Sequence, residues 1–276
     1  MENLKGLLNK HGVQLKKQYG QNFLTDVSLL SRIVDKAGVT EQTAVLEIGC
    51  GAGALTCELA KKAKKVLGYE IDSSLKPVLE QTVGDKSNVQ IVFKDVLKES
   101  LATIEDKLGD GYVMVANLPY YITTPIVMRF LEQSTKIKAL IIMVQEEVAD
   151  RFCAPPSNTE YGAITVAINL RGSANIIEYV PRQMFTPPPN VDSAVVKIDV
   201  DSNKFAGVDL EKVRQVVRAG FSSRRKMLVN NLMNFFKLNR TAAENVLIEA
   251  GVKLTDRAEN LSAEQFVKLS QVIFKG

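Results

Sequence analysis

The sequence predicts an α/β fold with a mostly parallel sheet, followed by a small all-helical domain. Between residues 44 and 200, short apolar runs alternate with longer segments of helical periodicity. This alternation is typical of parallel strands joined by crossover helices. After residue 207 the apolar residues recur only with helical spacing. We therefore divide the chain into a first domain of residues 1–203 and a helical domain of residues 204–276.

Seven apolar runs in the first domain have the length of buried strands. Five are expected to be parallel, and they cover residues 44–48, 65–70, 89–93, 112–116 and 139–144. Two later runs, 164–170 and 195–200, flank a proline-rich segment. Proline is confined to the edges of sheets, so these two runs are expected to form an antiparallel pair at the sheet edge. The predicted sheet thus has seven strands, the last of them antiparallel.

Helices are predicted on both sides of these strands. Residues 1–24 form a basic segment, and residues 27–37 have the spacing of an amphipathic helix. Residues 201–207 resemble a linker, because they are polar and end in glycine. The helical domain then contains four predicted helices, over residues 210–221, 225–236, 241–250 and 263–274.

The composition excludes several classes of protein. A chain of 276 residues with 46% hydrophobic and 24% charged residues is ordinary for a soluble globular protein. No run approaches the roughly 18 apolar residues of a membrane helix, and the first residues lack the layout of a signal peptide, so we expect a cytoplasmic protein without membrane contact. The three cysteines lack metal-ligand spacing, and His11 is the one histidine. We expect no metal site and no Ser-His-Asp mechanism.

Positive charge is concentrated near the C-terminus. Residues 204–276 contain 13 Lys and Arg against 7 Asp and Glu, whereas residues 1–203 contain 22 against 24. The helical domain therefore carries a net charge of +6 and the rest of the chain −2. Such an offset indicates an acidic polymer as partner, and nucleic acid is the commonest one in the cytoplasm.

A glycine-rich loop follows the first predicted strand. Gly49, Gly51 and Gly53 allow the backbone to approach a ligand without a clash from a side chain, and a predicted helix starts directly after them. The loop alone also fits the fingerprint of a dinucleotide site. A nicotinamide-dependent dehydrogenase therefore stays open at this point.

Polar residues lie at the ends of the next three strands. Glu70 ends the second strand, where a carboxylate can bind ribose hydroxyls, and Asp95 follows the third, where one can bind an adenine amine. After the fourth strand, an Asn-Leu-Pro-Tyr sequence presents the Asn117 amide, the Leu118 carbonyl and the Tyr120 ring. The proline keeps Leu118 out of the helical region, so its carbonyl is free to face a site. Together these groups suit a planar base with an exocyclic amine.

The order of the glycine loop, Glu70, Asp95 and Asn117 resembles the class I S-adenosylmethionine-dependent methyltransferases, which have a Rossmann-like fold. Four longer segments resemble the ribosomal RNA adenine dimethyltransferase family, in particular the branch that modifies small-subunit ribosomal RNA. These segments are residues 18–24, 117–125, 185–193 and 221–228. The resemblance extends over nearly the whole chain, and no motif position departs from it.

The resemblance implies S-adenosylmethionine as cofactor and a role for each residue around it. The implied contacts are Asn22 and Leu24 covering the cofactor, Gly49 in its loop, Glu70 at the ribose, Asp95 at the adenine and Asn117 beside the methyl group. It also implies that Phe185 holds the target adenine on the face opposite Tyr120. Chemically, the Asn117 side-chain oxygen and the Leu118 carbonyl can accept both amine protons and stabilise the positive charge that forms.

The basic residues near two of these motifs are expected to contact RNA phosphates. They are Lys16 and Lys17 near the N-terminus, and Arg218, Arg224, Arg225 and Lys226 in the helical domain. The resemblance implies an enzyme that methylates two adjacent adenosines in the 3′-terminal hairpin of 16S ribosomal RNA, with the immature 30S subunit as partner. For the oligomeric state we take a monomer as the default expectation. Two alternatives stay open: the erythromycin-resistance type that modifies 23S ribosomal RNA, and an RNA-binding ribosome-assembly factor with secondary catalysis.

Overall fold

The computed structural model describes residues 4–13 and 22–275. The chain divides into two compact units, one of Met1–Ala149 with Asn175–Val200 and one of Asp150–Ala174 with Asp201–Gly276. Helix α7 (Glu146–Cys153) contains the first of these boundaries. Each unit has its own buried core, so each is described separately below.

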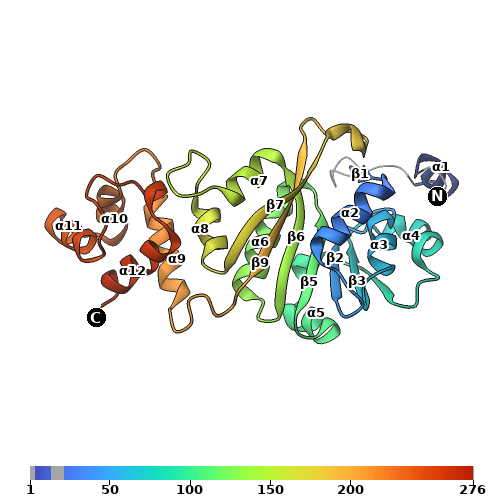
Figure 1. The fold of residues 1–276 in the computed structure, drawn as a ribbon, viewed down its shortest axis with the longest axis horizontal. Helices are drawn as coiled ribbons and strands as arrows, with labels where there is room; N and C mark the ends of the chain where they lie inside the picture. Colours follow the sequence, from blue (N-terminus) through green and yellow to red (C-terminus); the bar gives the residue numbers. More distant parts are fainter. Residues whose placement is uncertain (1–3, 14–21, 276) are drawn as a thin grey trace. The chain divides into compact units, whose positions relative to one another are not determined.

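The first unit is built on a seven-stranded sheet (Figure 1). In sheet order the strands are β4 (Val89–Phe93), β3 (Lys65–Glu70), β2 (Ala44–Ile48), β5 (Tyr112–Asn117), β6 (Ile137–Gln145), β9 (Ser193–Val200) and β7 (Gly172–Val180). Strands β2 to β6 run parallel, and β9 pairs antiparallel with β6. The predicted mostly parallel sheet with an antiparallel strand is confirmed. The chain moves outward from β2 to β4 and then returns to β5, so the crevice for a ligand opens where β2 and β5 end.

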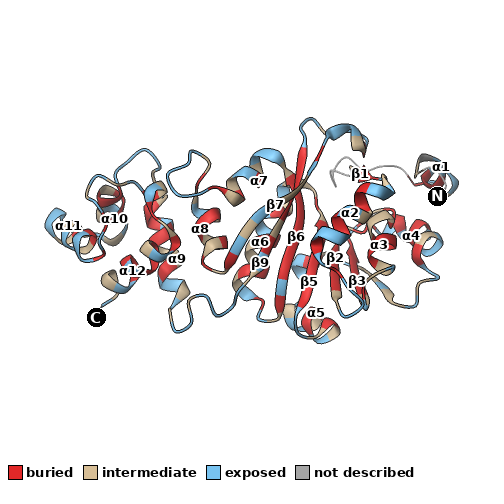
Figure 2. Ribbon diagram, viewed as in Figure 1, coloured by how far each residue is buried: buried red, intermediate tan, exposed pale blue. Residues whose placement is uncertain are grey.

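Helices cover both faces of this sheet. Helix α2 (Val27–Ala37) and helix α3 (Ala54–Ala60) share a buried core with Val113 and Val115 of β5. On the other face, α5 (Leu101–Leu108) contacts β2 and β3, and α6 (Tyr120–Gln133) contacts β6. Successive strand residues point to opposite faces, and both faces are covered, which is why the central strands are continuously buried in Figure 2.

Local capping sets the ends of α2 as the sequence predicted them. Asp26 accepts a hydrogen bond from the backbone of Leu29 at 2.8 Å, which caps the first turn. Gly38 ends the helix with a φ of 75°, a conformation that glycine adopts without strain. Between them Leu30, Ile33 and Val34 are buried against the sheet.

Helix α1 (Leu4–Lys10) was not predicted within the basic N-terminal segment. Its Leu7 and Leu8 share a buried core with Val78 and Leu79 of helix α4 (Lys76–Val83). Leu4, Leu7 and Leu8 have helical spacing, but a segment of seven residues is too short to form a stable helix by itself, and here it is the packing against α4 that buries Leu7 and Leu8.

The strand predicted over residues 164–170 is wrong, because this segment forms helix α8 (Ala163–Asn169). The Thr165 side chain caps the helix by accepting a hydrogen bond from the Gly162 backbone at 3.1 Å. Val166 and Leu170 are then buried in the core of the helical unit. The β-branched residues favour a strand locally, but burial against other helices overrides this propensity. The actual edge strand is β7, whose first four residues, Gly-Ser-Ala-Asn, contain no apolar run.

The second unit is helical. Besides α8 it contains the four predicted helices, which are α9 (Leu210–Gly220), α10 (Leu228–Phe236), α11 (Arg240–Glu249) and α12 (Ala263–Ile273). Its core also contains Tyr161, whose hydroxyl donates to the Leu261 carbonyl at 2.8 Å. The division predicted at residue 203 did not assign residues 150–174 to this unit. Among the described residues, every helix is too short or too polar to cross a membrane.

Candidate active site

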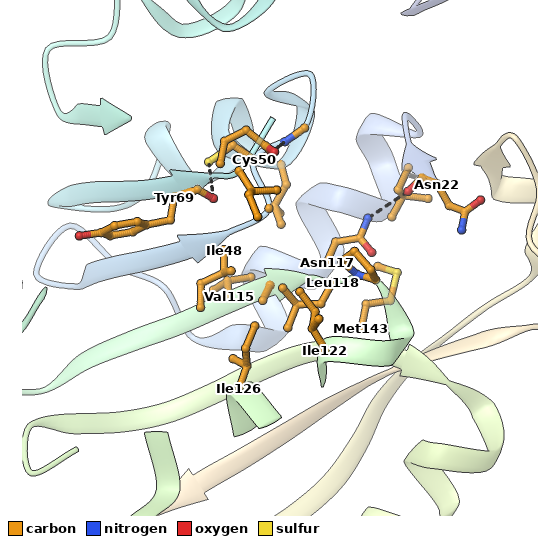
Figure 3. A pocket seen from close by; sticks show the side chains of 18 of the residues that line it. Asn22, Ile48, Cys50, Tyr69, Val115, Asn117, Leu118, Ile122, Ile126 and Met143 are labelled. Carbon is orange, nitrogen blue, oxygen red and sulfur yellow. Dashed lines mark hydrogen bonds between the residues drawn. The ribbon is translucent and has the colours of Figure 1, made fainter. Parts of the chain in front are cut away.

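A pocket with a volume of about 310 Å³ lies at the carboxyl ends of β2, β3, β4 and β5 (Figure 3). Most of the predicted cofactor and catalytic residues line it. These are Asn22, Leu24, Gly49, Gly51, Glu70, Asp95, Asn117, Leu118, Tyr120 and Phe185. The volume is that of a small-molecule site, and the strand-end position is the one that open α/β sheets use for ligands.

The glycine loop forms one wall of the pocket. Gly49 has a φ of 81°, and a Cβ on it would lie 3.0 Å from the backbone oxygen of Asn117. Gly51 has a φ of 56°, and its Cβ would lie 2.9 Å from the Phe23 ring. Glycine at both positions therefore lets the backbone pass close to its neighbours and to a ligand. Gly53 is not among the residues that line the pocket, and a Cβ on it would meet side chains of α4, so its contact with the cofactor stays a prediction.

Glu70 is a buried carboxylate held in place by two backbone groups. Gly51 donates to its Oε2 and Asp72 to its Oε1, each at 2.8 Å. Burial raises the pKa of Glu70, and these two hydrogen bonds oppose the rise. Each oxygen can accept a further hydrogen bond, so the fixed carboxylate fits the two hydroxyls of a ribose.

Asp95 follows β4, the neighbour of the strand that Glu70 ends, and both residues line the pocket. Its Oδ1 accepts from the Leu97 backbone at 3.0 Å and caps a short 3₁₀ turn, Val96–Lys98. Val96, Leu97 and Ile71 line the adjoining part of the pocket. Apolar walls next to a carboxylate suit an adenine ring with its exocyclic amine. The side chains present therefore fit an adenosyl cofactor.

Asn117 ends β5 and is positioned by the N-terminal segment. Its Nδ2 donates to the backbone oxygen of Asn22 at 3.4 Å, which leaves the side-chain oxygen as an acceptor (Figure 3). The chain then turns at Leu118 and Pro119, and Tyr120 begins α6. The predicted cluster thus lies at the end of a strand, as expected from the sequence, and a helix begins within it.

Two side chains from the segment 185–193 meet this cluster. The Tyr120 hydroxyl forms a 2.9 Å hydrogen bond with the hydroxyl of Ser193, which restrains the ring. Sequence reasoning gave Ser193 no role, although it ends one of the quoted motifs. Phe185 pairs with Leu24 in a two-stranded sheet of β1 (Phe23–Leu24) and β8 (Phe185–Thr186), and only 3% of it is exposed. Phe185 lines the pocket, and stacking on the target base stays a prediction for it.

Glu47 lies beneath the glycine loop and was not singled out from the sequence. It is completely buried on β2, and neither of its oxygens forms a hydrogen bond of normal geometry with any residue that the structure describes. Burial raises the pKa of Glu47 to about 8, the charge of Glu70 adds to the rise, and the nearby Thr56 hydroxyl opposes it. The carboxyl group is therefore held mainly protonated at neutral pH.

We expect Glu47→Gln to flatten the dependence of stability on pH. The pKa of Glu47 is about 8 in the folded protein, against an ordinary glutamate pKa of 4.5 in the unfolded chain. Between these values the folded protein holds a proton that the unfolded chain releases, so the free energy of unfolding falls as pH rises. The loss approaches about 1.4 kcal/mol per pH unit. Urea unfolding at several pH values from 5 to 8 measures it, and equal slopes for wild type and variant would contradict the assignment.

The predicted RNA-contacting residues are only partly described. Lys16 and Lys17 lie outside the described residues. In the helical unit, the side chains of Arg218, Arg224, Arg225 and Lys226 are exposed. Arg224 forms an ion pair of 3.3 Å with Glu259. The described residues contain no cluster of three or more His, Cys, Asp or Glu side chains arranged to hold a metal ion.

Comparison with known proteins places the chain in a family. The family model for ribosomal RNA adenine dimethylase matches residues 12–275. The chain belongs to the ribosomal RNA adenine dimethylase family. A relative in Bacillus licheniformis, named ribosomal RNA small subunit methyltransferase A, is 45% identical over 273 residues, which cover 96% of this chain and 94% of that protein. A protein of the same name in Bacillus pumilus is also 45% identical and covers 98% of this chain and 95% of its own.

Solved structures agree with this family. A dimethyladenosine transferase from Plasmodium falciparum has a TM-score of 0.77 at 25% identity, covering 90% of this chain and 95% of that one. The 23S rRNA methyltransferase ErmE has a TM-score of 0.71 at 29% identity, covering 91% and 99%. Family membership confirms the Rossmann-like methyltransferase fold, the enzyme class and S-adenosylmethionine as methyl donor. It also decides against the nicotinamide-dependent dehydrogenase.

Proposed function

We propose that this enzyme converts two adjacent adenosines in the 3′-terminal hairpin of 16S ribosomal RNA to N6-dimethyladenosines. The observation that carries this proposal is the position of Asn117, Leu118 and Tyr120 at the end of β5, in one pocket with Glu70 and Asp95. An acceptor pair and an aromatic ring thereby lie beside a site that fits an adenosyl group. We further propose that it acts in the cytoplasm, as a monomer, on the immature 30S subunit.

Similarity supports the small subunit as the target. The relatives that are 45% identical are named for the small subunit, whereas the 23S enzyme is 29% identical. The segment Phe-Thr-Pro-Pro-Pro-Asn-Val-Asp-Ser also favours the small-subunit branch over the erythromycin-resistance type.

The chemical problem is a weak nucleophile, since the lone pair of an adenine amine is delocalised into the ring. The Asn117 side-chain oxygen and the Leu118 carbonyl accept the two amine protons, which favours a pyramidal nitrogen and stabilises the developing positive charge. Bound S-adenosylmethionine supplies an electrophilic methyl group on a sulfonium leaving group. Glu70 and Asp95 hold the adenosyl part, so that nitrogen and methyl group are in line. The amine proton then leaves to water, and no histidine is required.

Tyr120 holds the target base out of its stack. Stacking of a base on an aromatic ring contributes about 1–3 kcal/mol and does not depend on sequence. The hydrogen bond between Tyr120 and Ser193 keeps the ring in one orientation before RNA binds. The enzyme recognises the hairpin by its shape and through contacts with its phosphates.

The test is to incubate the purified protein with methyl-labelled S-adenosylmethionine and ribosomal subunits from cells that lack this enzyme. We expect dimethyladenosine at two adjacent positions in the 3′ hairpin of the small-subunit RNA. Label in the large-subunit RNA instead would identify the erythromycin-resistance type. Tight binding without label would favour an assembly factor with secondary catalysis.

We expect replacement of Arg224, Arg225 and Lys226 by Ala to weaken RNA binding and to reduce its salt dependence. Each lost phosphate contact lowers the slope of log K against log salt by about 0.7–0.9, so three contacts lower it by roughly 2–3. Filter binding at several salt concentrations measures this slope.

A matched control removes the same charge elsewhere in the helical unit. Lys253, Lys268 and Lys275 are also exposed, and none of them belongs to the basic motif. Replacing these three lysines by Ala is expected to change the slope much less. Equal slopes for the two triple variants would show that the basic motif makes no specific phosphate contacts.

A further inference from the structure

The following inference rests on the proposed function, in which the product is dimethylated. A second methyl transfer poses a problem for the two acceptors, the Asn117 side-chain oxygen and the Leu118 carbonyl. After the first transfer, one amine hydrogen has been replaced by a methyl group. Placing that methyl group against an oxygen acceptor would replace a hydrogen bond by an apolar group in contact with a buried polar atom. The site therefore needs an apolar space next to Asn117.

The sheet places apolar side chains directly beside Asn117. Asn117 of β5 is in register with Met143 of β6, and Met143 is in register with Val195 of β9. Residues in register have side chains on the same face, and neighbouring strands are about 4.8 Å apart. Asn117, Met143 and Val195 therefore form one row across three strands, and all three line the pocket (Figure 3 shows Asn117 with Met143 next to it).

The β1–β8 pair adds two further apolar side chains to the lining of this part of the pocket. Leu24 and Phe185 are paired in register, line the same pocket and share a buried core with Met143 and Val195. Each of the four side chains is at most 4% exposed. The space that they line is apolar, and the Asn117 amide is the polar group at its edge. We call it the apolar recess.

We propose that the apolar recess receives the first methyl group, so that the monomethylated adenosine can bind again and accept a second one. The remaining N–H then donates to one of the two acceptors. The nitrogen lone pair forms the new N–C bond, the C–S bond of the donor breaks with its electron pair staying on sulfur, and the last amine proton leaves to water. Met143 and Val195 thereby determine whether the reaction continues to the dimethylated product.

Val195 offers a graded test. Val195→Ile and Val195→Phe fill the recess by different amounts, and Val195→Thr keeps its shape but makes it polar. A time course analysed by mass spectrometry gives the rates of the first and second transfers in each variant. We expect the ratio of the second rate to the first to fall, roughly 10-fold or more for Val195→Phe, with monomethyladenosine accumulating. A loss of stability alone would lower both rates without changing their ratio.

Val196→Ile is the matched control. Val196 is also completely buried on β9, but it points to the opposite face of the sheet from Val195. Val196→Ile adds one methylene group, as Val195→Ile does, but outside the pocket. We therefore expect the wild-type ratio of the second transfer rate to the first. If Val195→Phe does not fold, Val195→Ile and Val195→Thr carry the test. Unchanged ratios in these variants would overturn the role of the recess, whereas a wild-type protein that transfers no methyl group would overturn the proposed function itself.

Discussion

We expect Asn117→Ala to lower the turnover of methyl transfer by about 10²–10³-fold, the range measured when one oriented hydrogen-bonding group is removed from a transition state. The side-chain oxygen is one of two acceptors for the amine, and Ala leaves only the Leu118 carbonyl. The affinity for S-adenosylmethionine is expected to change only a few-fold, since Glu70 and Asp95 are untouched. Single-turnover rates with saturating RNA, and calorimetric titration with the cofactor, measure the two quantities separately.

Asn88→Ala is the control for this variant. The Asn88 amide donates to the carbonyls of Ala60 and Ala63 at 2.9 and 3.0 Å and does not line the pocket. This substitution removes a structural amide from the same unit, so it reports loss of stability without loss of the acceptor. A wild-type rate in Asn117→Ala would refute the role of the amide, and an equal loss of rate in both variants would attribute the effect to stability.

The second large effect is expected at Glu70. In Glu70→Gln, an NH₂ group replaces one carboxylate oxygen and must face a backbone donor, either Gly51 or Asp72. The side-chain NH₂ group and that backbone N–H are then two buried donors that face each other without an acceptor, and the ribose loses a charged acceptor. A lost hydrogen bond to a charged group is worth about 1.5–3 kcal/mol, so we expect the affinity for S-adenosylmethionine to fall roughly 10- to 100-fold.

Glu58→Gln serves as the matched control here. Glu58 is likewise a buried glutamate, on α3, but its carboxylate pairs with Lys61 at 2.6 Å and it does not line the pocket. We expect cofactor affinity close to that of wild type for this variant. Calorimetry with S-adenosylmethionine compares the two, and an unchanged dissociation constant in Glu70→Gln would remove Glu70 from the cofactor site.

Local sequence patterns were sufficient to predict the strands and helices whose apolar residues have a clear strand or helix period. The strands that end at Glu70 and Asn117 were predicted from their buried apolar runs, and helix α2 was predicted from its amphipathic spacing. Local patterns gave the wrong prediction for residues 164–170, where the composition favours a strand but packing in the helical core stabilises a helix. They also could not assign residues 150–174 to the helical unit, since that depends on which core buries Tyr161.

The class of fold, the strand ends that carry Glu70, Asp95 and Asn117, and the family could be predicted from the sequence, because these depend on short-range patterns and on motif order. The burial of Glu47 and the row of Asn117, Met143 and Val195 depend instead on how the sheet is assembled. Strand register joins segments that are far apart in the chain, and a shift of one residue would turn each side chain to the other face. The neighbours of the acceptor amide are therefore a property of the assembled sheet, which no local segment contains.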